Sequence, residues 1–140
     1  MHPFRKAVEE RDEKGVRALL ADDVVFTSPV AFKPYVGKPI TAAILRGVMR
    51  IFEDFRYVRE IHDGSGRDHA FVFETGIAGA PGVKITGCDF LHCNDDGLID
   101  DFMVMVRPLS GAKALSEAMG AQFDRIQQEA LELADEFTTA

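Results

Sequence analysis

Four segments between residues 55 and 108 constrain the fold of this chain most strongly, because short turn sequences separate them at regular intervals. They read FRYVREIH, HAFVFETGIAG, VKITGCDFLHCN and LIDDFMVMVRP, and the links between them are DGSGRD, GAPG and NDDG. Each segment is rich in β-branched and aromatic residues, and the links have hairpin length and composition. The pattern predicts four consecutive strands in an antiparallel meander, with the helices gathered on one face.

The remaining segments predict one further strand and several helices. Residues 3–21 have helical spacing of apolar residues with a break at Gly15, and ADDVVFTSP is typical of a strand that ends at Pro29. Residues 39–52 carry an apolar stripe wide enough for burial on more than one side. From about residue 111 to 137, apolar residues recur at steps of three or four, which predicts one long amphipathic helix.

We therefore expect a single α+β domain. Residues 1–110 should form a cone, in which one curved antiparallel or mixed sheet wraps on three helices. Residues 111–140 should form an appended C-terminal helix, whose stripe of Leu115, Met119, Phe123 and Ile126 needs an apolar surface. That surface is either the mouth of the cone or a partner subunit.

Composition excludes several classes of partner. The net charge of -7 argues against nucleic acid and anionic membranes, since both select clustered Lys and Arg. The first residues lack the apolar run of a signal peptide, and no apolar run has membrane-spanning length. Cys88 and Cys93 lie on opposite faces of one predicted strand, roughly 16 Å apart along it, too far for a disulfide. We expect a cytoplasmic protein.

Asp89 is the polar residue whose position in the pattern is unexpected. Alternation along the third strand of the meander places it on the same face as Ile85, Leu91 and Cys93, where an unpaired carboxylate is costly. A carboxyl group held there can act as an acid–base catalyst or anchor a ligand. Two other interpretations stay open: Asp89 caps a backbone group or pairs with a buried Arg, or a β-bulge at Gly87 turns it outward.

The order of these elements resembles the nuclear transport factor 2 superfamily, which includes ketosteroid isomerase, limonene-epoxide hydrolase and the SnoaL-like polyketide cyclases. LLADDVVFTSP and DFLHCNDDGLI carry the resemblance, which extends from about His2 to Pro108. It implies the cone fold, but the fold hosts many unrelated activities.

Ketosteroid isomerase uses carboxyl groups whose pKa values its pocket adjusts, and the resemblance carries its catalytic residues onto this chain one at a time. The oxyanion-hole Asp falls on Asp89, whereas the place of the general base is Ser28 and that of the oxyanion Tyr lies near Phe4. Steroid isomerisation by that mechanism is therefore not expected. The hydrolase pattern needs two acids and an Arg in the pocket, and alternation supplies one acid. A cyclase would need Asp89 as its base.

The cone is expected to enclose a small, mostly apolar pocket. Ser28 is a candidate pocket hydroxyl, although a Ser before Pro more commonly caps a turn. The residues predicted to line the pocket are Phe4, Phe26, Ser28, Leu45, Phe52, Phe71, Phe73, Thr75, Asp89, Phe102 and Val104.

No metal or cofactor is predicted. The four histidines, His2, His62, His69 and His92, lack metal-ligand spacing and are expected on the surface. No Gly-rich loop opens a helix, so a nucleotide site is not expected.

The last strand is apolar on both faces, so its outer face should also be covered. Met103, Met105 and Arg107 lie on that face and predict a homodimer, unless the C-terminal helix covers them in a monomer.

Three functions remain. The chain is an enzyme that isomerises, cyclises or hydrates a small apolar substrate with Asp89 as its catalytic group, a non-catalytic binder of a small hydrophobic molecule, or a dimeric interaction module with a vestigial pocket.

Overall fold

One mixed six-stranded sheet organises the computed structural model, which describes residues 1–139. Its order is β2–β1–β6–β5–β4–β3, and its neighbours are antiparallel except for the parallel pair β1–β6. The predicted curved meander is confirmed as β3 to β6. The strands are β1 (Leu20–Thr27), β2 (Tyr35–Val36), β3 (Phe52–His62), β4 (Asp68–Ile77), β5 (Lys84–Cys93) and β6 (Ile99–Arg107).

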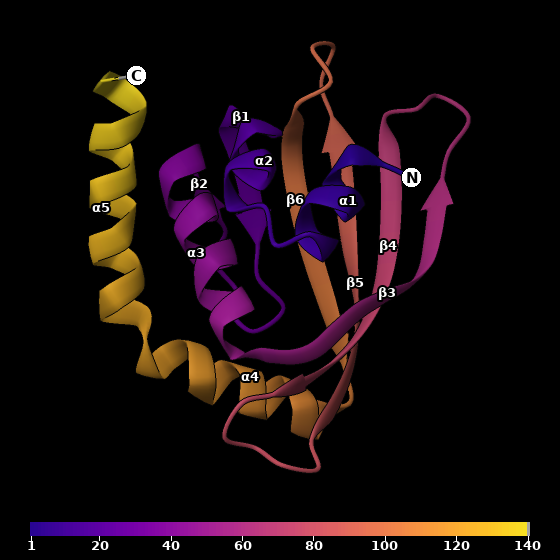
Figure 1. Ribbon diagram of the computed structural model, residues 1–140, viewed down its shortest axis with the longest axis vertical. Coiled ribbons are helices and arrows are strands. Elements are labelled where there is room, and N and C mark those ends of the chain that lie inside the picture. Colours follow the sequence, from indigo (N-terminus) through magenta and orange to yellow (C-terminus); the bar gives the residue numbers. More distant parts are fainter. Residues whose placement is uncertain (140) are drawn as a thin grey trace.

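Three helices lie against the concave side of the sheet, as the sequence predicts (Figure 1). They are α1 (Pro3–Glu9), α2 (Glu13–Ala18) and α3 (Lys38–Ile51). Side-chain caps fix where α1 and α2 begin. The ring of His2 accepts the N–H of Phe4, and the carboxylate of Asp12 accepts the N–H of Gly15. Within residues 1–139, no helix is long and apolar enough to cross a membrane.

The C-terminal segment differs from the prediction of one helix over 111–137. It forms α4 (Leu109–Ala121) and α5 (Phe123–Thr139), with a break at Gln122. Helix α4 runs along the lower edge of the sheet and α5 turns upward beside α3, and a straight helix cannot follow both surfaces (Figure 1). The break was missed because the apolar spacing of the sequence continues through it.

The C-terminal helices pack on their own cone. Leu115 of α4 and Ile126 of α5 are buried, and Met119 contributes to the cavity wall described below. Gly47 lets α5 approach α3, because a Cβ at residue 47 would lie 2.8 Å from Cδ1 of Ile126. The alternative in which this segment covers the outer face of β6 is therefore wrong.

Two irregularities in β3 curve the sheet. The register of β3 on β4 shifts between Glu53 and Arg56 and again between Tyr57 and Arg59, and Asp54 has a left-handed backbone with φ of 55°. An extra residue in one strand bends it and reverses the alternation of its side chains. Phe52 and Tyr57 are five residues apart, yet both are buried under the concave face.

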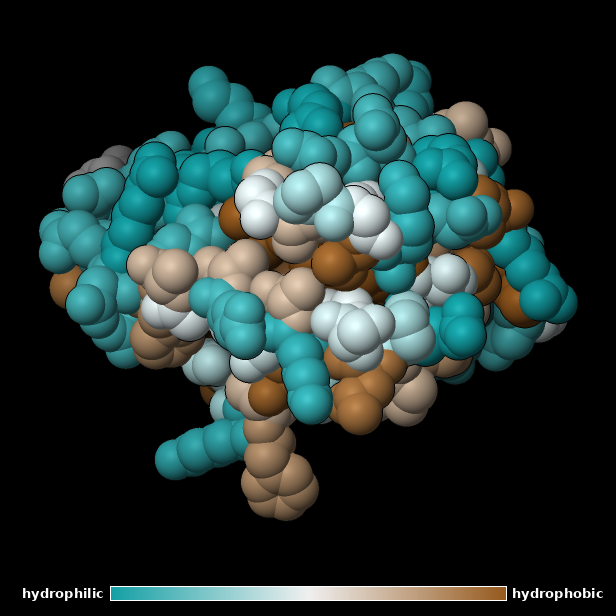
Figure 2. Space-filling model, turned by 90° about the horizontal axis from the view of Figure 1, so that it is seen from below, coloured by the Kyte–Doolittle hydropathy of each residue, from teal (hydrophilic) through white to brown (hydrophobic). Residues whose placement is uncertain are grey.

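The surface seen from below carries apolar side chains at its centre and polar side chains around them (Figure 2). This is the side on which α4 lies in Figure 1. Apolar side chains are therefore exposed on the side of the molecule where α4 lies.

Deletion of residues 112–140 should destabilise the domain, because it removes Leu115 and Ile126 from the core and exposes the face of α3 that they cover. We expect a lower thermal midpoint, lower solubility and stronger binding of a hydrophobic dye. Removal of residues 138–140 alone serves as the control and should change none of these three quantities. Unchanged stability and dye binding after the larger deletion would contradict this account of the helices.

Candidate functional site

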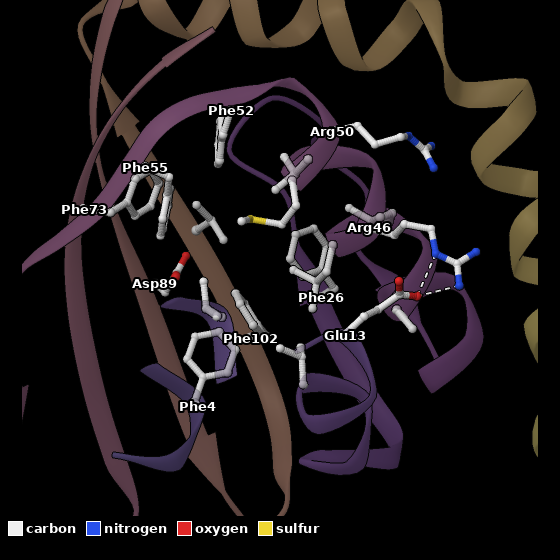
Figure 3. Close-up of a pocket in the computed structure, with 18 of the residues that line it drawn as sticks. Phe4, Glu13, Phe26, Arg46, Arg50, Phe52, Phe55, Phe73, Asp89 and Phe102 are labelled. Carbon is white, nitrogen blue, oxygen red and sulfur yellow. Dashed lines mark hydrogen bonds and ion pairs between the residues drawn. The ribbon is translucent and has the colours of Figure 1, made fainter. Parts of the chain in front are cut away.

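A cavity of about 410 Å³ lies between the concave face of the sheet and helices α1 to α4. This volume falls in the range of small-molecule sites. Aromatic and aliphatic side chains form its interior, and Figure 3 shows Asp89 among them, with Arg46 and Glu13 well apart from it. The predicted residues found in the wall are Phe4, Phe26, Ser28, Leu45, Phe52, Phe73, Asp89, Phe102 and Val104.

Phe71 and Thr75 are buried but are not among the cavity-lining residues, unlike the prediction. Phe71 packs between the rings of Phe4 and Tyr57, at centroid distances of 5.7 Å to each. The hydroxyl of Thr75 donates to the backbone carbonyl of Glu53 at 3.1 Å. Alternation predicted the correct face of β4 for both, but neighbouring side chains separate them from the cavity.

Ser28 lies in the cavity wall, and its hydroxyl is held by the turn that follows β1. Its Oγ accepts the backbone N–H groups of Val30 and Ala31, at 3.1 and 3.3 Å. The hydrogen bonds of this side chain are therefore those expected of a Ser that caps a turn. Within residues 1–139, no side chain is found hydrogen-bonded to this hydroxyl, which offers the cavity a weak polar contact.

The predicted inward orientation of Asp89 is confirmed, since only 7% of the residue is exposed. The bulge alternative at Gly87 is wrong: β4 and β5 pair in continuous register from Asp68 to Gly76. Gly87 instead makes room for an aromatic ring, because a Cβ there would lie 2.2 Å from the ring of Phe73.

Tyr57 of β3 is the partner of Asp89. Its hydroxyl donates to Oδ2 of Asp89 at 2.7 Å, and both side chains are buried. Burial raises the pKa of Asp89 to about 7, although the hydrogen bond from Tyr57 opposes the rise. Burial, together with the nearby Asp89 charge, raises the pKa of Tyr57 well above its usual value, so the phenol remains a donor. The pair places a carboxyl group that titrates near neutrality in an apolar cavity.

Tyr57 was not predicted in the site because the sequence placed Phe52 at the end of the preceding helix and began the strand at Phe55, so Phe52 and Tyr57 were never compared. The extra residue at Asp54 reverses the alternation between them. A signal was present: Phe55 and Tyr57 alternate with Arg56, which favours an apolar face for both rings, although it locates no bulge.

Charged side chains at the edge of the cavity connect α2 and α3 to α5. Arg46 binds Glu13 of α2 and Glu129 of α5, with nitrogen–oxygen distances of 2.5 and 3.0 Å. Arg50 binds Glu129 at 2.8 Å and also donates two hydrogen bonds to the side-chain oxygen of Gln122. These ion pairs hold α5 against α3 beside the cavity.

The expectation that all four histidines lie on the surface is wrong for His69. This residue is 8% exposed, and its ring lies 4.4 Å from that of His2 and 4.7 Å from that of His62. Its position after a polar turn suggested exposure, but the start of α1 folds over it. None of these three histidines lines the cavity.

Comparison with known proteins agrees with this geometry. The curved six-stranded sheet, with helices packed on its concave side, is the cone fold of the nuclear transport factor 2-like class. The chain belongs within it to the SnoaL-like domain family, which matches residues 2–102. No curated protein matches the chain.

Solved structures show the same relationship. A steroid delta-isomerase from Pseudomonas aeruginosa has a TM-score of 0.80 and 38% identity, over 89% of each chain. A protein with a cystatin-like fold from Silicibacter pomeroyi has a TM-score of 0.77 and 35% identity, over 86% of this chain and 82% of that chain. PrhC from Penicillium brasilianum shares the fold alone, at a TM-score of 0.63 and 17% identity, over 92% of this chain and 87% of that chain.

The raised pKa of Asp89 predicts a specific dependence of stability on pH. The folded protein holds this proton up to about pH 7, whereas the unfolded chain releases it near 3.8. The free energy of unfolding should therefore fall as pH rises between these values and stay level above them. The total decrease is on the order of 4 kcal/mol.

Asp89→Asn keeps an oxygen that accepts from Tyr57 and removes the titration. We expect the variant to match the wild type near pH 4 and to exceed its stability at pH 8, as measured by urea unfolding across this range. Asp22→Asn, at an exposed position of β1, is the control and should show no such gain. A variant less stable than the wild type at every pH would contradict the assignment.

Proposed function

We propose that this protein binds a small, largely apolar molecule with one carbonyl oxygen, and that Asp89 moves a proton on it. The observation that supports the proposal is a carboxyl group with a pKa of about 7 in an apolar cavity, beside a phenol that donates to it. A catalytic acid or base works best when its pKa lies near the working pH. The activity is then that of a cofactor-independent isomerase, cyclase or hydratase.

The geometry supports Asp89 as the base. Tyr57 occupies Oδ2, and no hydrogen bond to Oδ1 is found within residues 1–139. In its ionised form, Asp89 would accept a proton from the carbon next to the carbonyl group and return it to another carbon of the same substrate. Tyr57 would stabilise the ionised carboxylate and fix its orientation, which makes it a positioning residue in this step.

Steroid isomerisation is a weaker candidate for this chain, although the Pseudomonas aeruginosa relative is described as a steroid delta-isomerase. The resemblance puts Ser28 at the place of the isomerase base, and its hydroxyl accepts two backbone N–H groups. Phe4 stands near the place of the oxyanion phenol and cannot donate a hydrogen bond. We expect turnover of a Δ5-3-ketosteroid far below that of true isomerases, since loss of a general base typically costs 10²–10⁴-fold.

A non-catalytic binder is the second candidate, and one observation favours it. Asp89 is the one acidic residue deep in the cavity wall, since the other acids that line it, Asp12 and Glu13, belong to the start of α2. Protonated Asp89 would then donate to the carbonyl oxygen of the ligand and fix its orientation.

Deuterium exchange separates the two candidates without knowledge of the product. The protein is incubated in D₂O with a Δ5-3-ketosteroid or with smaller cyclic ketones, and deuterium next to the carbonyl is measured by mass spectrometry. For an enzyme, we expect exchange above the buffer rate, and kcat/KM that rises with pH through about 7 as Asp89 ionises. Asp89→Asn should lower the rate at least 10²-fold.

Tyr57→Phe and Asp22→Asn serve as the diagnostic variant and the control. Because the Tyr57 hydrogen bond lowers the pKa of Asp89, Tyr57→Phe should move the midpoint of the profile to higher pH, and Asp22→Asn should not. Binding without exchange, with an affinity that falls as pH rises through 7, would establish the binder instead. Absence of both binding and exchange with every ketone would contradict the whole proposal.

We also propose that the outer face of β5 and β6 forms a homodimer interface in the cytoplasm. Met105 is 54% exposed and Phe90 is 37% exposed, and Phe90 pairs across the strands with Met103. Arg107 lies at the end of the same face, and α5 packs on α3 rather than here. Exposed apolar side chains in a contiguous row favour a partner surface.

Sedimentation at micromolar concentration tests the interface. We expect a dimer for the wild type and a monomer for Met105→Glu, because a carboxylate in the centre of the interface would be desolvated without a partner. Leu131→Glu introduces the same charge at an exposed position of α5 and should remain dimeric. A monomeric wild type, or a dimer that Met105→Glu leaves intact, would contradict the proposal.

A further inference from the structure

A second group of chemically reactive side chains lies outside the cavity wall, where α1 begins against one end of β4 and β5. One potential ligand atom each from His2, His69 and Cys93 lie within 4.8 Å of one another. His69 and Cys93 are 8% and 6% exposed, and neither belongs to the pair of residues that the proposed function uses. Two imidazoles and a thiol are the ligand types that zinc takes in proteins.

Neighbouring acceptors determine which nitrogen of each ring is free. Nε2 of His69 lies 3.0 Å from the carbonyl oxygen of Gly66, which can only accept, so Nε2 carries the hydrogen. Nε2 of His62 lies 2.5 Å from a carboxylate oxygen of Glu60, so it carries the hydrogen as well. In the neutral rings, both Nδ1 atoms therefore present lone pairs.

These two lone pairs face each other. Nδ1 of His62 and Nδ1 of His69 are 2.6 Å apart, although neither atom has a hydrogen to donate when the rings are neutral. Two acceptors at this distance repel each other unless a proton or another cation lies between or beside them. A proton or a metal ion must therefore lie at this point, and His2 and Cys93 are near enough to His69 to supply further ligands to a metal.

We propose that His69 and Cys93, together with His2 and His62, form a zinc-binding site. Neutral imidazole nitrogens and a thiolate form a borderline-soft ligand set, which favours zinc over calcium and magnesium. The hydrogen bonds from His69 to Gly66 and from His62 to Glu60 are the outer contacts that orient histidine ligands in metal sites.

The charge around the cluster also favours a cation. Burial, followed by the negative charges of Asp100 and Asp68, raises the pKa of Cys93, and the same two charges would attract a cation bound beside it. Coordination by His2 would replace the hydrogen bond that its Nδ1 accepts from Phe4, or use the other nitrogen after a change of tautomer. The metal would then tie the start of α1 to β4 and β5, and α1 supplies Phe4 to the cavity wall.

Titration of the full chain with zinc, without a histidine tag, tests the site. We expect one equivalent of Zn²⁺ by calorimetry and a higher thermal midpoint, because a ligand that binds only the folded state stabilises it. Co²⁺ in place of Zn²⁺ should give an absorption band for charge transfer from thiolate to cobalt, which reports a cysteine ligand directly. Neither readout depends on an enzymatic activity.

Matched variants assign the ligands. Cys93→Ala should abolish the cobalt charge-transfer band, and His69→Gln should weaken zinc binding at least tenfold. Cys88→Ala, on the opposite face of β5, and His92→Gln, which is paired with Asp100, should bind as the wild type does. The side chain of His62 is partly exposed, so His62→Gln should fold even if a variant of the buried residues does not. It should also weaken zinc binding.

These experiments test the zinc site independently of the proposed function at Asp89. No stoichiometric binding to the wild type, or a bound cobalt without the thiolate band, would overturn the proposal and leave a shared proton between His62 and His69. Equal loss in Cys88→Ala and Cys93→Ala would also overturn it. A zinc site that persists in Asp89→Asn, whatever the deuterium exchange shows, would establish that the two sites are independent.

Discussion

The curvature of β3 is the constraint on which the cavity and its chemistry depend. An untwisted, regular strand would pair with β4 along its whole length and would turn Phe52 and Tyr57 to opposite faces. The extra residue at Asp54, in a left-handed conformation, bends the strand and brings both rings under the concave face. Space between the sheet and the three helices follows from that bend, and so does the meeting of Tyr57 and Asp89.

Burial of Asp89 is a cost that the fold carries rather than a source of its stability. A carboxyl group without a cation beside it takes up a proton more readily, and the one donor found for it within residues 1–139 is a phenol. Neighbouring residues are shaped around it: Gly87 admits the ring of Phe73, and the rings of Phe55 and Phe73 pack at 5.1 Å. A costly polar group in a closely packed aromatic setting is typical of a functional site.

Apolar burial and ion pairs both attach the C-terminal helices to the cone, and they contribute unequally. Ile126 and Leu133 are buried to 1% exposure or less, and such burial contributes roughly 1.5–3 kcal/mol for each side chain. The ion pairs of Arg46 and Arg50 with Glu129 are partly solvated and contribute less to stability. Their directionality sets where α5 lies on α3, while apolar burial supplies most of the attachment.

The sequence by itself determined the class of fold and the inward position of Asp89, and nine of the eleven residues that it placed in the cavity wall are found there. Period-two alternation and turn residues are local properties, and β4 and β5 follow them without interruption. Tertiary structure decided the partner of Asp89, the exclusion of Phe71 and Thr75 from the cavity, the break at Gln122 and the burial of His69. Each of these depends on an irregular residue or on a contact between distant segments, and neither leaves a periodic signal in the chain.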